Sequence, residues 1–388
     1  MKIFFDENMP FAREFFADFG LLTAFNGRTL RSEHVTDADV LLVRSITKVN
    51  QQLLADNKQI KFVGSATIGV DHVDQDYLAT RNIPFYSAPG CNAISVGEYV
   101  ISALVVMAER YLLDLSQLTV GIVGAGNTGS RVSEKLTAIG VKHHLCDPPL
   151  AKTDDPRDFV ELEQVLNCDA ICLHVPLTKS GPDATYHLLN QERLAKLSDQ
   201  QIVINACRGE VIDNKALLAQ KQQGHGVKLV LDVWENEPDI LLPLIDHADL
   251  ATAHIAGYSL EGKARGTEML YRALCHELHL PVTKCLADFL PQPVVSELNV
   301  DAASLVEHKQ ALPFALTASE QSQQVLLTPM VKMVYDVNRD DGLFRQQINQ
   351  HGFDFIRKTY PTRREFSSLT VNDGNSQYSS SIRALGFS

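Results

Sequence analysis

The stretch Val120-Gly121-Ile122-Val123-Gly124-Ala125-Gly126-Asn127-Thr128-Gly129 joins a short apolar run directly to three glycines in the pattern GxGxxG. The apolar run predicts a β-strand, and residues 130–139 after it predict a helix. In such a unit the first glycine permits a tight turn, the second lets the backbone approach a pyrophosphate, and the third lets helix and strand pack closely. The stretch therefore predicts a parallel α/β domain that binds a dinucleotide.

An acidic residue follows at the position where this motif places one. The next apolar run, residues 141–146, ends at Asp147, about 20 residues beyond the last glycine. A carboxylate here accepts hydrogen bonds from the adenosine ribose and repels a 2′-phosphate, so we expect NAD rather than NADP. The alternative is that Asp147, followed by Pro148 and Pro149, only ends a strand.

Short apolar runs alternate with helical stretches on both sides of the motif. They recur within residues 1–90, one long helix is expected over 92–113, and the rhythm restarts up to residue 252. This alternation is typical of two consecutive doubly wound, Rossmann-like parallel-sheet domains. A proline-punctuated stretch places a boundary near residue 282, and a mixed α+β unit is expected beyond it.

Three domains follow from this pattern. We expect residues 1–95 and 257–282 in a substrate-binding domain, 96–256 in the NAD-binding domain, and 283–388 in a C-terminal domain. The last of these carries no motif with a chemical interpretation.

The composition is that of a globular chain, with 388 residues of which 45% are hydrophobic and 21% charged. A formal net charge of −12 gives no general attraction to nucleic acid or an anionic membrane, so a small-molecule partner is expected. Asp6 and Glu7 interrupt the apolar start, unlike a signal peptide, and the apolar run at residues 99–108 is too short to span a bilayer. We expect a cytoplasmic protein.

Seven cysteines are spread along the chain without a CxxC pair. Reduced and mostly buried thiols are therefore expected. Cys168 and Cys172, with His143, His144 and Cys146, are the alternative as metal ligands, but they lack the paired close spacings of zinc sites. We expect no metal.

Polar residues follow three successive apolar runs of the second domain, and they include Arg208, Glu237 and His254. Because ligands bind at the carboxyl ends of the strands in a doubly wound sheet, these side chains should meet at one edge. An arginine fork holds a carboxylate, a histidine takes a hydroxyl proton, and a neighbouring carboxylate orients the imidazole ring. This set suits the oxidation of a 2-hydroxy acid, for which the cofactor accepts hydride.

Each of these residues also has a purely structural interpretation. Arg208 can cap a loop, Glu237 before Pro238 can be a turn carboxylate, and Asp232 can be a hydrogen bonder at a strand end. His254 can be a surface or core histidine. Their joint placement at one edge of a sheet with a dinucleotide motif favours catalysis.

The three segments NACRG (205–209), DVWENEP (232–238) and HIAG (254–257) resemble the catalytic segments of the D-2-hydroxyacid dehydrogenase family. The resemblance covers about residues 1–280. It implies Arg208 for carboxylate binding, His254 as acid/base catalyst with Glu237 as its partner, and Asp232 near the nicotinamide amide. The expected contacts with NAD are Gly124, Gly126, Asn127, Thr128, Gly129, Asp147, Val175, Ala206, Cys207, Arg208, Asp232 and Gly257.

Further segments resemble one branch of that family, whose members act on a phosphorylated 2-hydroxy acid and dimerise through a third domain. They are DENMP (6–10), VRSITKVN (43–50), CDPP (146–149) and HIAGYSLEGKARGT (254–267). This resemblance spans the whole chain. It implies a phosphorylated substrate and a homodimer formed through residues 283–388.

The substrate phosphate is expected in the first domain. Arg44 and Ser45 follow the apolar run 40–43, and Thr67 follows the run 60–63, so they should lie at carboxyl strand ends. A guanidinium fork and a hydroxyl suit phosphate oxygens, and Tyr258 is a further expected substrate contact. The alternative is that Arg44 forms an ion pair between domains and Ser45 caps a helix.

Two other functions stay open from the sequence. A sister enzyme such as phosphoglycerate dehydrogenase shares the three catalytic segments, although the Tyr258 motif argues against it. A corepressor that senses NAD also belongs to this broad family. Formation of NADH with a 2-hydroxy acid distinguishes an enzyme from a protein that only senses NAD.

Overall fold

The computed structural model describes residues 1–300, 320–374 and 376–388. They form two compact units, one of Met1–Asn92 with Tyr258–Gln292 and one of Ala93–Gly257 with Pro293–Ser388. The three-part division predicted from the sequence is finer than this one and stays a prediction.

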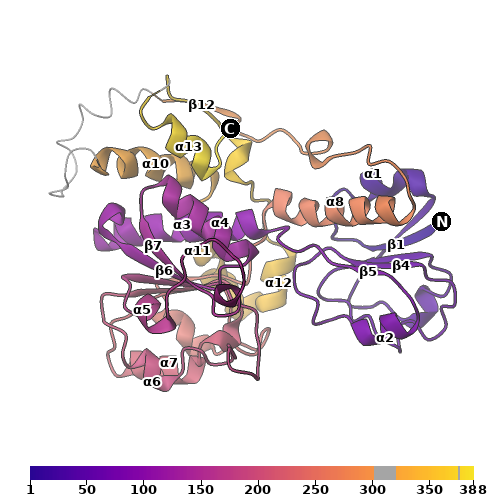
Figure 1. The fold of residues 1–388 in the computed structure, drawn as a ribbon, viewed down its shortest axis with the longest axis horizontal. Helices are drawn as coiled ribbons and strands as arrows, with labels where there is room; N and C mark the ends of the chain where they lie inside the picture. The colour runs from indigo at the N-terminus through magenta and orange to yellow at the C-terminus, as the bar shows by residue number, and fades with distance from the viewer. Residues whose placement is uncertain (301–319, 375) are drawn as a thin grey trace. The chain divides into compact units, whose positions relative to one another are not determined.

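The first unit is built on a parallel sheet with the strand order β2-β1-β3-β4-β5. The strands are β1 (Lys2–Asp6), β2 (Leu21–Phe25), β3 (Val40–Val43), β4 (Phe62–Ser65) and β5 (Phe85–Tyr86). On one side of the sheet lie α1 (Ala12–Phe16) and α8 (Leu260–Glu277), and on the other lies α2 (Gln75–Thr80) (Figure 1).

Alternation of side chains along the strands gives this unit a core on each face of the sheet. Ile3 and Phe5 pack in one apolar cluster with Phe15 of α1 and Tyr271 of α8, whose ring centroids lie 5.3 Å apart. Phe4 packs in the other cluster, on the side of α2. The loops after β3 and β4 carry the residues predicted to hold the substrate phosphate.

The second unit contains a six-stranded parallel sheet with the order β11-β10-β9-β8-β6-β7. The strands are β6 (Thr119–Val123), β7 (Lys142–Cys146), β8 (Ala170–Leu173), β9 (Ile202–Asn205), β10 (Lys228–Leu231) and β11 (Leu250–Ala251). One face is covered by α3 (Ala93–Tyr111) and α4 (Asn127–Ala138), the other by α5 (Leu162–Leu166), α6 (Gln191–Leu194) and α7 (Asn214–Gln222) (Figure 1). The doubly wound arrangement predicted from the sequence is confirmed.

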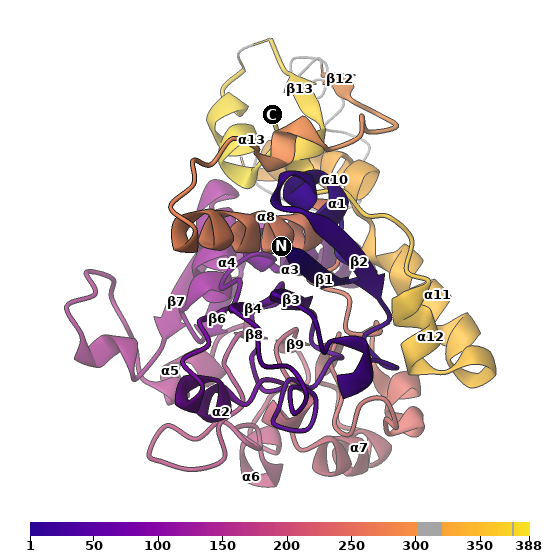
Figure 2. The ribbon, with the colours of Figure 1, turned by 90° about the vertical axis from the view of Figure 1, so that its right-hand side faces the viewer.

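The C-terminal region contributes to the core of this second unit. It contains β12 (Glu297–Asn299), α10 (Glu320–Val334), α11 (Val337–His351), α12 (Phe353–Lys358), β13 (Thr370–Asn372) and α13 (Ser379–Leu385), with β12 and β13 paired in parallel (Figure 2). Phe344 and Ile348 of α11 join the cluster that also holds Leu231 and Trp234. The indole of Trp234 stacks on Phe344 with ring centroids 5.7 Å apart. The region therefore carries one small sheet among helices, as an α+β unit should, while its dimerisation role stays a prediction.

Helix α3 is apolar because both of its sides are buried. Its residues from Val96 to Ala108 are buried, and the helix packs against α4, α10 and α11. Within the described parts of the chain, no helix combines the length and the apolar character needed to cross a membrane.

One carboxyl on α3, that of Glu98, is buried. Glu98 Oε1 accepts a hydrogen bond from the Phe366 amide at 3.0 Å and lies 3.4 Å from Lys135 Nζ. Burial raises the pKa of Glu98 to about 8, although the charge of Lys135 opposes the rise. In the unfolded chain the same carboxyl ionises near pH 4.5. Folding therefore takes up a proton between these two pH values.

Because the folded state binds the extra proton, the stability that Glu98 contributes falls as the pH rises from about 4.5 through about 8. We expect the free energy of unfolding to fall by about 3 kcal/mol between pH 6 and pH 9 through this group alone. Glu98→Gln should lose that dependence and be the more stable protein at pH 9. Urea unfolding at both pH values measures the free energy of unfolding of the two proteins. An equal fall of this free energy from pH 6 to pH 9 in both proteins would contradict this assignment.

Candidate active site

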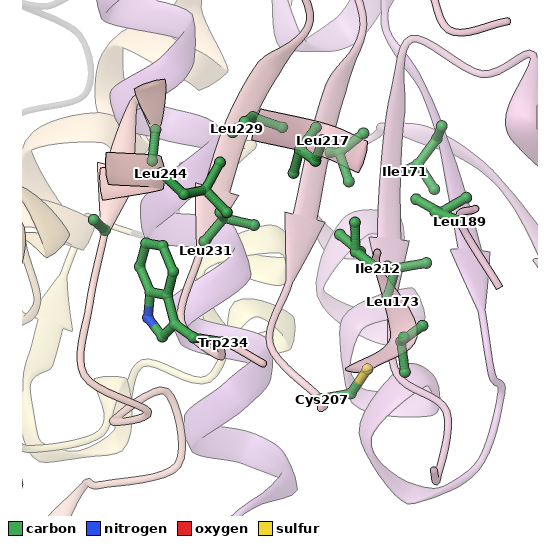
Figure 3. Packing of buried hydrophobic residues seen from close by; sticks show 14 of the residues in the cluster. Ile171, Leu173, Leu189, Cys207, Ile212, Leu217, Leu229, Leu231, Trp234 and Leu244 are labelled. Atoms are coloured by element: carbon green, nitrogen blue, oxygen red, sulfur yellow. The ribbon is translucent and has the colours of Figure 1, made fainter. Parts of the chain in front are cut away.

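The predicted catalytic residues of the second unit follow three neighbouring strands. Arg208 comes after β9, Glu237 lies in the loop after β10, and His254 follows β11. Figure 3 shows Cys207 beyond the end of β9, and Trp234 in the loop that continues β10. Because all these strands are parallel, the loops that follow them leave the same edge of the sheet.

His254 and Glu237 form a direct pair. Nδ1 of His254 lies 2.7 Å from Oε2 of Glu237, and the other oxygen of Glu237 accepts a bond from the Trp234 amide at 2.9 Å. Burial by itself would raise the pKa of Glu237, but the His254 charge and hydrogen bond, with smaller contributions from the Trp234 amide and Arg357, lower it. An ionised Glu237 therefore holds the ring so that Nε2 is the nitrogen left for proton transfer.

The backbone at His254 is in the left-handed region, with φ of 55°. A residue other than glycine keeps this conformation only where its surroundings impose it, and such residues concentrate at functional sites. One constraint is the His254 amide, which donates to the Asp232 carbonyl at 2.6 Å. The histidine loop is therefore bound directly to the end of β10.

Asp232 organises the same loop through its buried carboxylate. Oδ1 accepts bonds from Thr252 Oγ1 and the Ile255 amide, both at 2.7 Å, and Oδ2 accepts one from the Ala256 amide at 2.9 Å. Burial raises the pKa of Asp232, and the His254 charge and these hydrogen bonds oppose the rise. Its predicted contact with the nicotinamide amide stays a prediction.

Arg208 lies on a turn that is stabilised by hydrogen bonds with Cys207 and Asn205. Its Nη1 donates to the Cys207 carbonyl at 2.7 Å, and its carbonyl accepts from Asn205 Nδ2 at 3.0 Å. An added Cβ at Gly209 would lie 1.9 Å from the Trp234 carbonyl carbon, so only glycine lets this turn meet the loop after β10. Burial raises the pKa of the Cys207 thiol to about 11, which leaves it protonated and unreactive.

The glycine-rich turn has the shape that a pyrophosphate requires. Gly124 has φ of 91°, and a Cβ there would lie 2.6 Å from the His174 carbonyl and 2.9 Å from Val175. A Cβ on Gly129 would lie 1.9 Å from the Gly124 carbonyl, so helix and strand approach closely. Gly126 faces open space and begins α4 without a side-chain cap, which leaves the first amides of α4 to bind an anion. These residues fit NAD.

Asp147 lies beside this turn. Its Oδ2 accepts a bond from the Ala125 amide at 2.8 Å, and its Oδ1 accepts one from Leu150 at 3.0 Å. Arg157, which the sequence did not indicate, donates to the Ala125 carbonyl and to Ser130 Oγ, both at 2.9 Å, and pairs with Asp155. A carboxylate and a guanidinium therefore flank the turn at the place where the ribose is expected.

We expect Asp147→Ala to reduce the preference for NAD over NADP by about tenfold to a hundredfold. Loss of the carboxylate removes its repulsion of a 2′-phosphate and leaves Arg157 as the charge nearest the turn. The ratio of kcat/KM with the two cofactors measures this change. Asp154→Ala, which removes an exposed acid seven residues on, is the control, and an unchanged ratio in Asp147→Ala would show that another residue reads the ribose.

Ala206 and Gly257, the remaining predicted NAD contacts, belong to the second unit, whereas the residues predicted to contact the substrate belong to the first. Ser65 Oγ lies 2.7 Å from Thr67 Oγ1 and 2.9 Å from His72 Nε2, while Thr67 donates to the Gly69 carbonyl at 3.1 Å. Arg44 is half-buried and forms no ion pair with any residue that the structure describes. Ser45 is exposed, and Tyr258 lies against Lys263, with 5.5 Å from its ring centroid to Nζ.

One group of metal-binding residue types lies together in the described part of the chain. His187, Asp213 and Glu235 bring one ligand atom each within 4.8 Å of one another. Glu235 already accepts bonds from His187 Nε2 at 2.7 Å and from the Asn214 amide at 2.9 Å, and Asp213 caps α7. The fold itself therefore accounts for this group. The seven cysteines are free thiols, and six of them are buried.

Several residues of the site were not predicted from the sequence. The hydroxyl of Thr252 joins Asp232 to Tyr99 on α3, whose OH lies 2.9 Å from Thr252 Oγ1. Trp234 Nε1 donates to the Thr252 carbonyl at 2.9 Å. A polar side chain in a long apolar helix, such as Tyr99, is the kind of signal that would have indicated a buried partner.

Comparison with known proteins agrees with this geometry. A family described as D-isomer specific 2-hydroxyacid dehydrogenase, NAD binding domain, matches residues 98–256, and a domain of unknown function matches residues 310–386. Erythronate-4-phosphate dehydrogenase of Colwellia psychrerythraea is 56% identical over 408 residues, covering 100% of this chain and 99% of the relative. The protein of the same name from Pseudoalteromonas atlantica is 50% identical over 388 residues, with 100% and 99% covered.

Solved structures share the fold. D-lactate dehydrogenase from Aquifex aeolicus, complexed with NAD and lactic acid, is 25% identical, with a TM-score of 0.58 over 71% of this chain and 95% of that chain. Together with the glycine-rich turn, these findings define an NAD-dependent dehydrogenase. The chain belongs to the D-isomer specific 2-hydroxyacid dehydrogenase family, and within it to the group that includes the Colwellia and Pseudoalteromonas proteins.

Proposed function

We propose that the protein oxidises 4-phospho-D-erythronate to 2-oxo-3-hydroxy-4-phosphobutanoate with NAD, as a step in pyridoxal 5′-phosphate biosynthesis. The observation that carries the chemistry is the His254–Glu237 pair at 2.7 Å, at the sheet edge that Arg208 also follows. The choice of substrate rests on the names of full-length relatives at 50% and 56% identity.

In this proposal each side chain has a separate task. The guanidinium of Arg208 binds the substrate carboxylate and polarises the oxygen at C2. His254 takes the C2 hydroxyl proton on Nε2, and Glu237 stabilises the imidazolium that forms. NAD, held by the glycine-rich turn and α4, supplies the acceptor for the C2 hydride. Asp232 keeps the His254 loop in place through the Ile255 and Ala256 amides.

The phosphate of the substrate is assigned to the first unit. Arg44 is half-buried without an ion-pair partner among the described residues, and its charge acts on the nearby Cys91 thiol, as does that of Arg265. Two guanidinium groups therefore lie near one point of the unit, and the hydroxyl of Ser45 is exposed beside Arg44. Thr67 and Tyr258 are assigned to the same substrate. Charged hydrogen bonds to phosphate oxygens are the strong kind.

We expect a preference for the phosphorylated acid, and we expect this preference to be lost when Arg44 is replaced. Among phosphorylated and plain 2-hydroxy acids, including 3-phosphoglycerate, kcat/KM should be highest for 4-phospho-D-erythronate. Arg44→Ala should lower that value about tenfold to a hundredfold and leave plain erythronate nearly unchanged, because only the phosphorylated acid loses a charged hydrogen bond. Arg31→Ala, which removes an exposed arginine of the same unit, is the control. Equal losses for both acids in Arg44→Ala would place the phosphate elsewhere.

Two alternatives are tested by the same panel. A higher kcat/KM with 3-phosphoglycerate would favour the sister enzyme, and absence of NADH formation with every acid would favour a protein that only senses NAD. We also propose that residues 283–388 form the contact between the two chains of a homodimer.

A further inference from the structure

Arg363 is a buried arginine in the segment between α12 and α13. It is 2% exposed, and its guanidinium carbon lies 4.1 Å from the ring centroid of Tyr335. Its Nη2 donates two hydrogen bonds, one to the Ser95 carbonyl at 2.9 Å and one to the Ala256 carbonyl at 2.7 Å. Both acceptors belong to the second unit, as Arg363 does.

The two carbonyls have distinctive places in the chain. Ala256 comes two residues after His254, and its amide is one of those held by Asp232. Ser95 lies in the first turn of α3, and its hydroxyl donates to Glu365 at 2.9 Å. The chain leaves the first unit after Asn92 and returns to it after Gly257, so Arg363 joins the two segments that make these connections.

The burial of this guanidinium needs a physical reason. Its Nε and Nη1 are buried without a hydrogen-bond partner among the described residues. Burying a charge in this way costs stability, and an apolar side chain of similar length would fill the space at less cost. What the arginine adds over such a side chain is the pair of bonds from Nη2 and the contact of its charge with the Tyr335 ring.

One of those bonds, the one to the Ala256 carbonyl, acts on the loop of His254. Asp232 holds residues 254–256 through amide groups on one side, and Arg363 holds the same stretch through the Ala256 carbonyl. A left-handed histidine with φ of 55° persists only when its surroundings determine the backbone on several sides. Without Arg363 the loop loses the constraint at the Ala256 carbonyl and keeps only those at its amide groups.

We propose that Arg363 is a positioning residue for the dehydrogenase reaction, which fixes His254 through the Ala256 carbonyl and so gives the C-terminal region a part in catalysis. The inference rests on the acid/base role proposed above for His254. Arg363 should affect proton transfer, because a small displacement of the histidine slows that step. It should not affect NAD binding, which depends on the glycine-rich turn.

The test replaces Arg363 by methionine, which keeps the length of the side chain and removes both bonds. We expect kcat to fall about tenfold to a hundredfold while the KM for NAD stays within about twofold. The control is Arg345→Met, because Arg345 of α11 also donates to two carbonyls of the second unit, Ile245 at 2.8 Å and Ala248 at 2.7 Å. That variant should keep its kcat.

A double-mutant cycle with His254→Asn separates positioning from a general loss of structure. If Arg363 acts through His254, Arg363→Met should have little further effect on kcat once His254 is absent. The same fold-loss in both backgrounds, or an unchanged kcat in Arg363→Met, overturns the inference. Should Arg363→Met not fold, Arg363→Leu, which likewise offers no hydrogen-bond donor, takes its place in the cycle, with the same outcomes.

The two proposals fail in different ways. Absence of NADH formation from 4-phospho-D-erythronate in the unaltered protein contradicts the proposed function whatever Arg363 does, and full activity of His254→Asn contradicts the acid/base role of His254. A large loss in His254→Asn together with normal kcat in Arg363→Met contradicts only the role of Arg363.

Discussion

Replacement of His254 by asparagine is expected to lower kcat about a hundredfold to ten-thousandfold, the range that a general acid/base contributes. The amide cannot take the hydroxyl proton, although its NH2 group can still donate a hydrogen bond to Glu237. NAD binding should change little, because the cofactor is held by the glycine-rich turn and α4. Steady-state kinetics and titration of NADH fluorescence measure the two effects separately.

His276→Asn is the matched control, since the His276 side chain is 83% exposed at the end of α8. A second, graded variant is Glu237→Gln, which removes the charge that stabilises a protonated His254. In this variant the acid limb of the pH profile for oxidation should move to lower pH, because the imidazole then holds its proton less tightly. An unchanged kcat in His254→Asn would remove the histidine from the mechanism.

Replacement of Arg208 by glutamine should lower kcat/KM for the hydroxy acid about a hundredfold to a thousandfold, the loss expected for a charged, bidentate grip on a carboxylate. The turn should survive this change, since Asn205 Nδ2 binds the main-chain carbonyl of residue 208 rather than its side chain. The KM for NAD should stay nearly constant.

Arg208→Lys tests the geometry of the grip. A lysine keeps the charge but offers no planar fork, so it should recover only a small part of the loss. Arg193→Gln, whose half-exposed guanidinium donates to the Leu188 carbonyl elsewhere in the unit, is the control. Full activity of Arg208→Lys would show that charge alone is needed there, and full activity of Arg208→Gln would place the substrate carboxylate elsewhere.

Much of the fold could be predicted from the sequence because its strands are buried on both faces. Residues 40–43 and 170–173 are continuous apolar runs, and both form strands that lie inside a sheet. Strand β2 (Leu21–Phe25) was not predicted, because it lies at the edge of its sheet and only its last residue is buried. Its backbone pairing with β1, rather than its side chains, makes it a strand.

The candidate site could be predicted in part for a related reason. In a parallel sheet the residue after each apolar run lies at one edge, so the strand-end rule placed Glu237 and His254 near each other, and they form a pair. The rule says nothing of residues that reach the site from elsewhere in the chain. Tyr99 and Arg363 lie more than a hundred residues from their partners Thr252 and Ala256, and only the packed structure brings them together.

In the proposed reaction the chain transfers the C2 hydride of a phosphorylated hydroxy acid to NAD, with His254 as the base. The most direct test uses 4-phospho-D-erythronate carrying deuterium at C2, with mass analysis of the reduced cofactor. We predict that the deuterium appears in the reduced cofactor, and that this transfer is slowed about a hundredfold or more in His254→Asn. Deuterium found in water instead of the cofactor, or equal transfer in both proteins, would contradict it.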